Sequence, residues 1–216
     1  MTSQTPLPEL VRDTKLQATI QGELTIHTRP FGRRRYERWK LKHILGHGGC
    51  GVVWLECKVK DGTQEEDAGE SRAVKRIDTS GHRSEHYVRE LEALAKFSQD
   101  KVHSIAHWKL PAAGRSLLTR RFQYSDFFVT SFGWYDSPGY LYIAMEYCEY
   151  GDLKKYLADN NNVLPESQVK EIISQVLAGV ALMHEAGFAN RDIKPAVSGR
   201  PDAPSRCVAH VLFRTS

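Results

Sequence analysis

The chain has 216 residues, of which 41% are hydrophobic and 26% charged, the balance of a soluble globular protein that can build a core of its own. Its formal net charge of +4 is too small to indicate nucleic-acid binding, so we expect no specific nucleic-acid partner. No run of about 18 apolar residues is present, which predicts no membrane span, and residues 1–30 lack the apolar segment of a signal peptide.

The four cysteines show neither C-x-x-C pairing nor metal-ligand spacing: Cys50, Cys57, Cys148 and Cys207. This favours free thiols in a reducing compartment and predicts no cysteine-based metal site. We therefore expect an intracellular protein, cytoplasmic or nuclear.

Residues 1–35 are mixed polar sequence and are predicted to form a flank outside the folded domain. They end in the basic cluster Arg33–Arg35, which is typical either of a nuclear address or of a solvated approach to a first strand.

From Tyr36 onward the pattern indicates strands, followed by helices. Strands are expected near Trp39–Leu45, Val52–Leu55, Arg72–Ile77, Phe127–Trp134 and Tyr140–Tyr147, with one helix over Ser84–Phe97. A short helix is expected over Asp152–Leu157, and a long one from Pro165 that carries an apolar stripe and ends at Gly187. This outline predicts an α+β protein with two lobes.

A glycine string occupies the turn between the first two predicted strands. Gly46–Val53 fits the pattern G-x-G-x-x-G-x-V, which dinucleotide-binding folds also approach. Those folds need a helix after the last glycine, whereas Val52–Leu55 is β-branched and aromatic and favours a strand. The string therefore predicts a hairpin that can bring its backbone N–H groups close to phosphates. By itself, an ordinary glycine-rich hairpin is an equally good interpretation.

Two charged residues follow the glycine string in an informative order. Ala73 and Lys75 share one face of their strand by its two-residue period, so a small side chain can lie over a flat base while the lysine reaches phosphates. Glu90, fifteen residues later on the predicted helix, is the expected ion-pair partner of Lys75.

Together with three later motifs, these residues resemble the first half of a eukaryotic-type serine/threonine protein kinase. Met145–Cys148 resembles the hinge between the lobes, and Tyr150–Leu153 follows it with an acidic residue. Asn190–Pro195 resembles the catalytic loop in its serine/threonine form. The resemblance implies a five-stranded antiparallel N-lobe sheet with one helix over 36–147, and a hinge with the start of an incomplete helical C-lobe over 148–195.

The resemblance also implies ATP as the cofactor, a protein substrate that the sequence does not identify, and roles for individual residues. Asp192 would accept the proton of the substrate hydroxyl, and Lys194 would hold the transferring phosphoryl group. The implied ATP-binding residues are Leu45, Gly46, Gly48, Gly51, Val53, Ala73, Lys75, Glu90, Met145, Glu146, Cys148 and Asp152.

The sequence departs from the kinase pattern at and after the catalytic loop. Asn190 replaces the usual histidine, and Val197 stands where the family has a magnesium-binding asparagine. No D-F-G follows, and residues 196–216 are off the pattern. The family implies magnesium, but its ligands are missing here. We therefore expect a truncated chain that is inactive as written, with a nucleotide-binding or scaffold fragment as the alternative to an active kinase.

Residues 102–123 form a foreign insert, because joining Lys101 to Tyr124 gives a natural loop. The codons for Val102 and Val197 must begin with GT, and Phe122-Gln123 can be encoded as TTYCAG. These features are compatible with two unspliced introns, and the alternative is a true insertion with a true C-terminal truncation.

Overall fold

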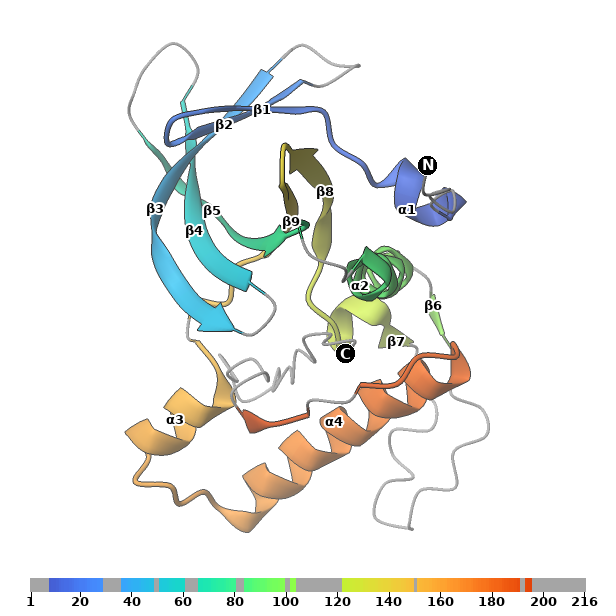
Figure 1. Ribbon diagram of the computed structural model, residues 1–216. Coiled ribbons are helices and arrows are strands. Elements are labelled where there is room, and N and C mark those ends of the chain that lie inside the picture. The colour runs from blue at the N-terminus through green and yellow to red at the C-terminus, as the bar shows by residue number, and fades with distance from the viewer. Residues whose placement is uncertain are drawn as a thin grey trace. The chain divides into compact units, whose positions relative to one another are not determined.

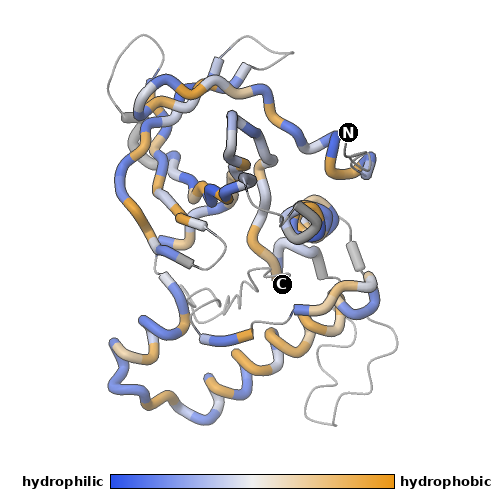
Figure 2. The backbone as a smooth tube through the Cα atoms, viewed as in Figure 1, coloured by the Kyte–Doolittle hydropathy of each residue, from blue (hydrophilic) through white to orange (hydrophobic). Residues whose placement is uncertain are grey.

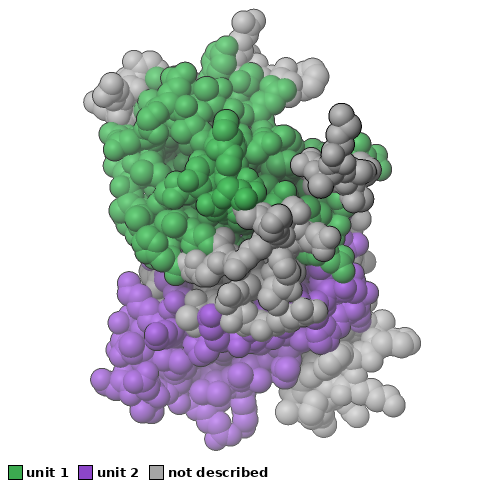
Figure 3. Space-filling model, in the orientation of Figure 1, with its two compact units in different colours: residues 1–95, 130–147, 216 green, residues 96–129, 148–215 purple. Residues whose placement is uncertain are grey.

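The computed structural model describes residues 8–28, 36–48, 51–60, 66–80, 84–99, 102–103, 122–149, 151–190 and 193–195. The chain divides into two compact units, coloured separately in Figure 3. Unit 1 comprises Met1–Ala95, Thr130–Tyr147 and Ser216, and unit 2 comprises Lys96–Val129 and Cys148–Thr215. The first lobe expected from the sequence, 36–147, thus differs from unit 1, which includes the N-terminal residues and lacks 96–129.

A seven-stranded antiparallel sheet, in the order β1-β2-β3-β4-β5-β9-β8, forms most of unit 1 (Figure 1). Its strands are β1 Ala18–Gln21, β2 Leu24–Thr28, β3 Tyr36–Gly48, β4 Gly51–Val59, β5 Glu66–Asp78, β8 Ser131–Ser137 and β9 Tyr140–Glu146. The α+β class is confirmed, but the expected number of five strands was wrong. The hairpin β1–β2 lies within residues 1–35, for which the sequence predicts only a polar flank.

Two helices belong wholly or mainly to unit 1: α1, Glu9–Asp13, and α2, Ser84–Phe97. The bounds of α2 are those predicted from its helical period. Its apolar side chains Leu91 and Leu94 are buried, so the stripe that made the helix predictable is the side that packs.

A core cluster holds one face of the unit 1 sheet together. Val74, Tyr135, Tyr142 and Ala144 are buried in it, and the rings of Tyr135 and Tyr142 stack with centroids 4.9 Å apart. The partly buried residues against it are Leu16, Ala18, Trp54 and Tyr140, the first two from the N-terminal segment.

Unit 2 contains the short strands β6, Val102–His103, and β7, Phe122–Gln123, a 3-10 helix at Tyr124–Asp126, and the helices α3, Leu153–Asp159, and α4, Glu166–Glu185. The expected strand Phe127–Trp134 begins only at Ser131. Phe128 instead packs against Phe97, with their ring centroids 4.4 Å apart. Burial in an aromatic cluster, and not strand pairing, explains the apolar residues there.

Helix α4 begins after Pro165 and is stopped by Gly187, which follows its C-cap Ala186, as the sequence predicts. Phe188 N–H donates to Met183 C=O and Gly187 N–H to His184 C=O, with Gly187 at φ +78°, so the last turn closes in a Schellman motif. Ile172 and Met183 are buried. In Figure 2, apolar and polar residues alternate along the helix. No helix of the described part of the chain is long and apolar enough to cross a membrane.

Candidate nucleotide-binding site

The ion pair expected between Lys75 and Glu90 is formed within unit 1. The ammonium of Lys75, on β5, donates to Oε1 of Glu90, on α2. The two side chains are 14% and 7% exposed, so the pair is mostly removed from water and little screened by salt. The pair ties the helix to β5, an interior strand of the sheet, and holds the lysine in one position.

Strand registers place an apolar surface beside this lysine. Val53, Lys75 and Ile143 lie opposite one another on β4, β5 and β9, and the row two residues along contains Leu55, Ala73 and Met145. Opposite residues, and residues two apart, share a face of an antiparallel sheet. The face therefore places small and apolar side chains, most of them buried, next to one fixed cation, a combination that suits a flat apolar group joined to an anion.

The glycine hairpin connects β3 to β4, with Gly48 opposite Gly51. Gly51 has φ +136°, and a β-carbon there would stand 1.9 Å from the carbonyl oxygen of Arg76. Only glycine fits this close approach of β4 to β5. Gly46 is different, because a β-carbon there would meet no protein atom within 4 Å. The space over Gly46 can therefore be approached from outside the chain.

The predicted hinge residues begin in unit 1. Met145 is 6% exposed at the end of β9, where it lies opposite Ala73. Glu146 N–H donates to Thr130 C=O at 2.9 Å, so this N–H is already satisfied by the protein. Leu45 lies at a register irregularity of β3 and is 38% exposed.

Other predicted site residues belong to unit 2, which is described by itself. Asp152 is the N-cap of α3, where its Oδ1 accepts a hydrogen bond from Lys155 N–H at 2.8 Å. This capping role was missed in the sequence, although an aspartate just before a helix is a common signal for it. Cys148 C=O accepts from Gly151 N–H at 3.0 Å, Lys194 is exposed, and Asp192 lies outside the described residues.

A second set of charges, on the opposite face of the sheet, was also missed. Arg72 and Glu56 are each 3% exposed and form an ion pair through two hydrogen bonds, from Arg72 Nε at 2.9 Å and Nη2 at 2.6 Å. The only sequence signal is that Arg72 and Lys75, an odd number of residues apart, must point to opposite faces of one strand.

Comparison with known proteins agrees with this arrangement. Residues 39–196 match the model of the protein kinase domain family. The chain is 31% identical over 161 residues to the inhibitor of nuclear factor kappa-B kinase subunit alpha of Xenopus laevis, covering 73% of this chain and 18% of that protein. It is 23% identical over 172 residues to the serine/threonine-protein kinase ppk35 of Schizosaccharomyces pombe, covering 77% and 23%. The chain thus spans about a fifth of the length of these relatives.

Among solved structures, the chain is similar to Rad53 1-466, whose crystal structure is a complex with AMP-PNP. The TM-score is 0.56 with 20% sequence identity, and the match covers 82% of this chain and 38% of that one. At this identity the similarity concerns the fold.

Proposed function

This chain belongs to the protein kinase domain family, and from that premise we propose that unit 1 binds ATP and that the site is built for phosphoryl transfer to serine or threonine of a protein. The observation that carries the proposal is the ion pair between Lys75 and Glu90 beside the apolar face of the sheet. A surface lysine would be solvated and movable, whereas this one is held where an anion can meet it.

The proposed contacts follow the shapes and charges of the parts of ATP. Leu45 and Val53, on the neighbouring strands β3 and β4, pack against the base, with Ala73 beside it and Met145 limiting the depth of the pocket. The backbones of Glu146 and Cys148 meet the adenine edge, and since Glu146 N–H already donates to Thr130 C=O, the contact from Glu146 is made by its C=O. The backbone at Gly46, Gly48 and Gly51 approaches the phosphates. Asp152, whose Oδ1 caps α3, is the residue proposed to bind the ribose.

The proposed reaction uses two residues of the catalytic loop. The substrate hydroxyl oxygen attacks the γ-phosphorus, the bond to the β,γ-bridging oxygen breaks, and ADP leaves. Asp192 takes the hydroxyl proton, a role worth about 10²–10⁴ in rate, and Lys194 neutralises charge on the transferred group.

Magnesium does not fit the residues of this sequence as it fits the family pattern. The side chain of Val197 has no atom that can bind a metal ion, and the described residues contain no group of three His, Cys, Asp or Glu side chains placed to hold one. This observation favours the second candidate function, a nucleotide-binding module without efficient transfer, for the sequence as given.

ATP titration with and without magnesium tests both functions. We expect measurable binding that magnesium strengthens little, and loss of binding in Lys75→Met combined with Glu90→Gln, which removes both charges together. Lys60→Ala, which removes an exposed cation of unit 1 outside the site, serves as the control. Transfer of labelled phosphate to a generic protein substrate separates the enzyme from the binding module. An unchanged affinity in the double variant contradicts the proposed site.

The proposal also covers the cellular location of the protein and the origin of the insert 102–123 and the tail. The four cysteines show neither C-x-x-C pairing nor metal-ligand spacing, which supports a reducing, cytoplasmic or nuclear location. The ends of the insert 102–123 pair with each other, which supports its separability from the domain. Genomic sequence across Val102, Gln123 and Val197, read beside spliced transcripts, tests whether the insert and the tail are unspliced introns.

A further inference from the structure

The N-terminal segment joins the two edges of the unit 1 sheet. β1 and β8 are the outermost strands in the sheet order, yet the chain leading into β1 runs along β8. Lys15 pairs with Trp134 in parallel, with Leu16 N–H donating to Trp134 C=O at 2.7 Å and Trp134 N–H to Thr14 C=O at 3.1 Å. The curved sheet is thereby closed at this point.

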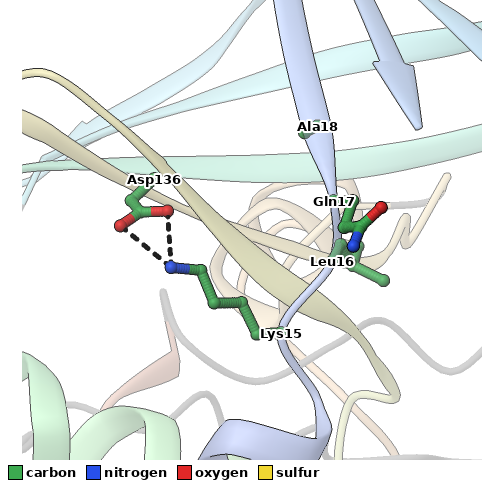
Figure 4. Close-up of a pocket in the computed structure, with 5 residues that line it drawn as sticks. All are labelled: Lys15, Leu16, Gln17, Ala18 and Asp136. Atoms are coloured by element: carbon green, nitrogen blue, oxygen red, sulfur yellow. Dashed lines mark hydrogen bonds and ion pairs between the residues drawn. The ribbon is translucent and has the colours of Figure 1, made fainter. Parts of the chain in front are cut away.

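Side chains fix the same junction. Lys15 Nζ lies 2.9 Å from a carboxylate oxygen of Asp136, at the rim of an open hollow (Figure 4). Val11 is fully buried, and its C=O accepts a hydrogen bond from Trp134 Nε1 at 2.7 Å. At Gly133 a β-carbon would stand 2.6 Å from Thr14 C=O, so glycine is needed for the segment to approach β8 this closely.

Inside the closed sheet, the hairpin contacts the buried ion pair of Arg72 and Glu56. Thr25 Oγ1, on β2, donates to Glu56 Oε1 at 2.9 Å. Arg72 Nη2 lies 2.9 Å from His27 Nε2, also on β2, and this ring nitrogen must accept because a guanidinium only donates. Thr25 and His27 are 5% and 4% exposed, so the hairpin supplies two polar partners that water would supply if the hairpin were absent.

Two aromatic rings complete the surroundings of the ion pair. The Arg72 guanidinium lies over the ring of Trp39, on β3, at 4.2 Å from its centroid. The ring of Tyr135, on β8, meets His27 edge to face at 5.1 Å. Strands β2, β3, β4, β5 and β8 thus each contribute to one buried network, and Arg72 connects it to β5, the strand that carries Lys75.

We propose that residues 8–28 are a clasp that closes the N-lobe sheet, and that Arg72 is a positioning residue which transmits the state of this clasp to β5 and Lys75. The part of the proposal that concerns Lys75 rests on the proposed ATP binding. Opening of the clasp leaves Arg72 and Glu56 without Thr25 and His27, so the network and the strand that carries it loosen together.

Hydrogen exchange of the whole wild-type chain, followed by mass spectrometry, tests the clasp without any variant. Amides of 18–28 and of 72–76 should exchange with one common opening rate, as members of one cooperative unit. Much faster exchange of 18–28 than of 72–76 would show that the hairpin opens by itself, and would overturn the proposal.

Substitutions that remove a single hydroxyl test whether the hairpin acts on β5 through Glu56. Thr25→Val removes the hydrogen bond to Glu56 without changing the shape of the side chain, and it should raise the exchange of 72–76 by about tenfold or more. Thr28→Val on the exposed end of the same strand, and Thr25→Ser, which keeps the hydroxyl, should leave it unchanged. Equal effects of Thr25→Val and Thr28→Val on the exchange of 72–76 would contradict coupling through Glu56.

ATP titration of the same variants distinguishes a failure of this proposal from a failure of the proposed function. If wild-type chain binds ATP, Thr25→Val should weaken binding severalfold while Thr28→Val does not. If wild-type chain binds no ATP, the proposed function fails, and the exchange of 72–76 still decides whether the clasp acts on β5. An effect of Thr25→Val on exchange with no effect on ATP affinity overturns the positioning role of Arg72.

Discussion

Gly51 lies so close to β5 that a β-carbon on it would stand 1.9 Å from the carbonyl oxygen of Arg76. Glycine therefore occurs at two positions of the hairpin for two different reasons. Gly51 is required by the protein's own packing, whereas the space over Gly46 is open and is available to a ligand.

This difference predicts opposite behaviour of two alanine variants. Gly51→Ala must shift backbone and adopt an unfavourable φ, so we expect it to lower the free energy of unfolding by about 2–4 kcal/mol. Gly46→Ala should leave the stability within about 0.5 kcal/mol of wild type but weaken ATP binding. Urea unfolding and ATP titration of both variants measure this. Equal stability of the two would show that the close approach to Arg76 does not exist.

The exposed side of α4 predicts self-association. Val169, Ile173 and Leu177, spaced four residues apart, are 42%, 52% and 50% exposed, and such a stripe on a helix is typical of an unpaired contact surface. Ile173→Glu should therefore reduce light scattering without lowering the melting temperature.

Ile172→Glu is the matched comparison, because Ile172 is only 6% exposed. Burying its carboxylate should cost about 3–5 kcal/mol of stability. A monomeric wild-type chain that resists proteolysis across α4 would contradict the stripe as a site of self-association.

The insert 102–123 is expected to be removable. Its ends pair residue by residue, Val102 with Gln123 and His103 with Phe122. Residues opposite each other in an antiparallel pair have Cα atoms about 4.5–5.5 Å apart, close to the 3.8 Å of one peptide link. A chain with Lys101 joined to Tyr124 should keep the wild-type melting temperature within a few degrees. Unfolding of this variant would show that the insert is a necessary part of unit 2.

The burial of Tyr135 predicts that the free energy of unfolding falls at alkaline pH. Burial, and then the negative charge of Glu56, raises the pKa of its hydroxyl above the ordinary value of about 10. Above that pH the unfolded chain releases the proton and the folded chain keeps it, so the stability is present below pH 10 and falls as the pH rises.

Tyr135→Phe should therefore flatten the decline of unfolding free energy above pH 10. Tyr36→Phe, at a residue 55% exposed, provides the control and should leave the decline as it is. An identical decline in wild type and Tyr135→Phe would show that the buried hydroxyl is not its source.

The sequence alone determined the parts of this protein in which local pattern and tertiary burial agree. The bounds of α2, the end of α4 at Gly187, the glycine hairpin and the pair of Lys75 with Glu90 were all predicted, because each follows from a short-range period or a fixed order of motifs. The functional roles assigned to these residues remain predictions.

Only the tertiary structure decided the hairpin β1–β2. Strand prediction assumes that apolar residues face inward, but in β2 the buried positions are Thr25 and His27, while the alternating apolar residues Leu24 and Ile26 are only half-buried. Their burial is stable because Arg72 and Glu56 meet them inside the sheet. These partners are 31 and 45 residues away in the sequence, and no local period can reveal a polar interior that long-range pairing creates.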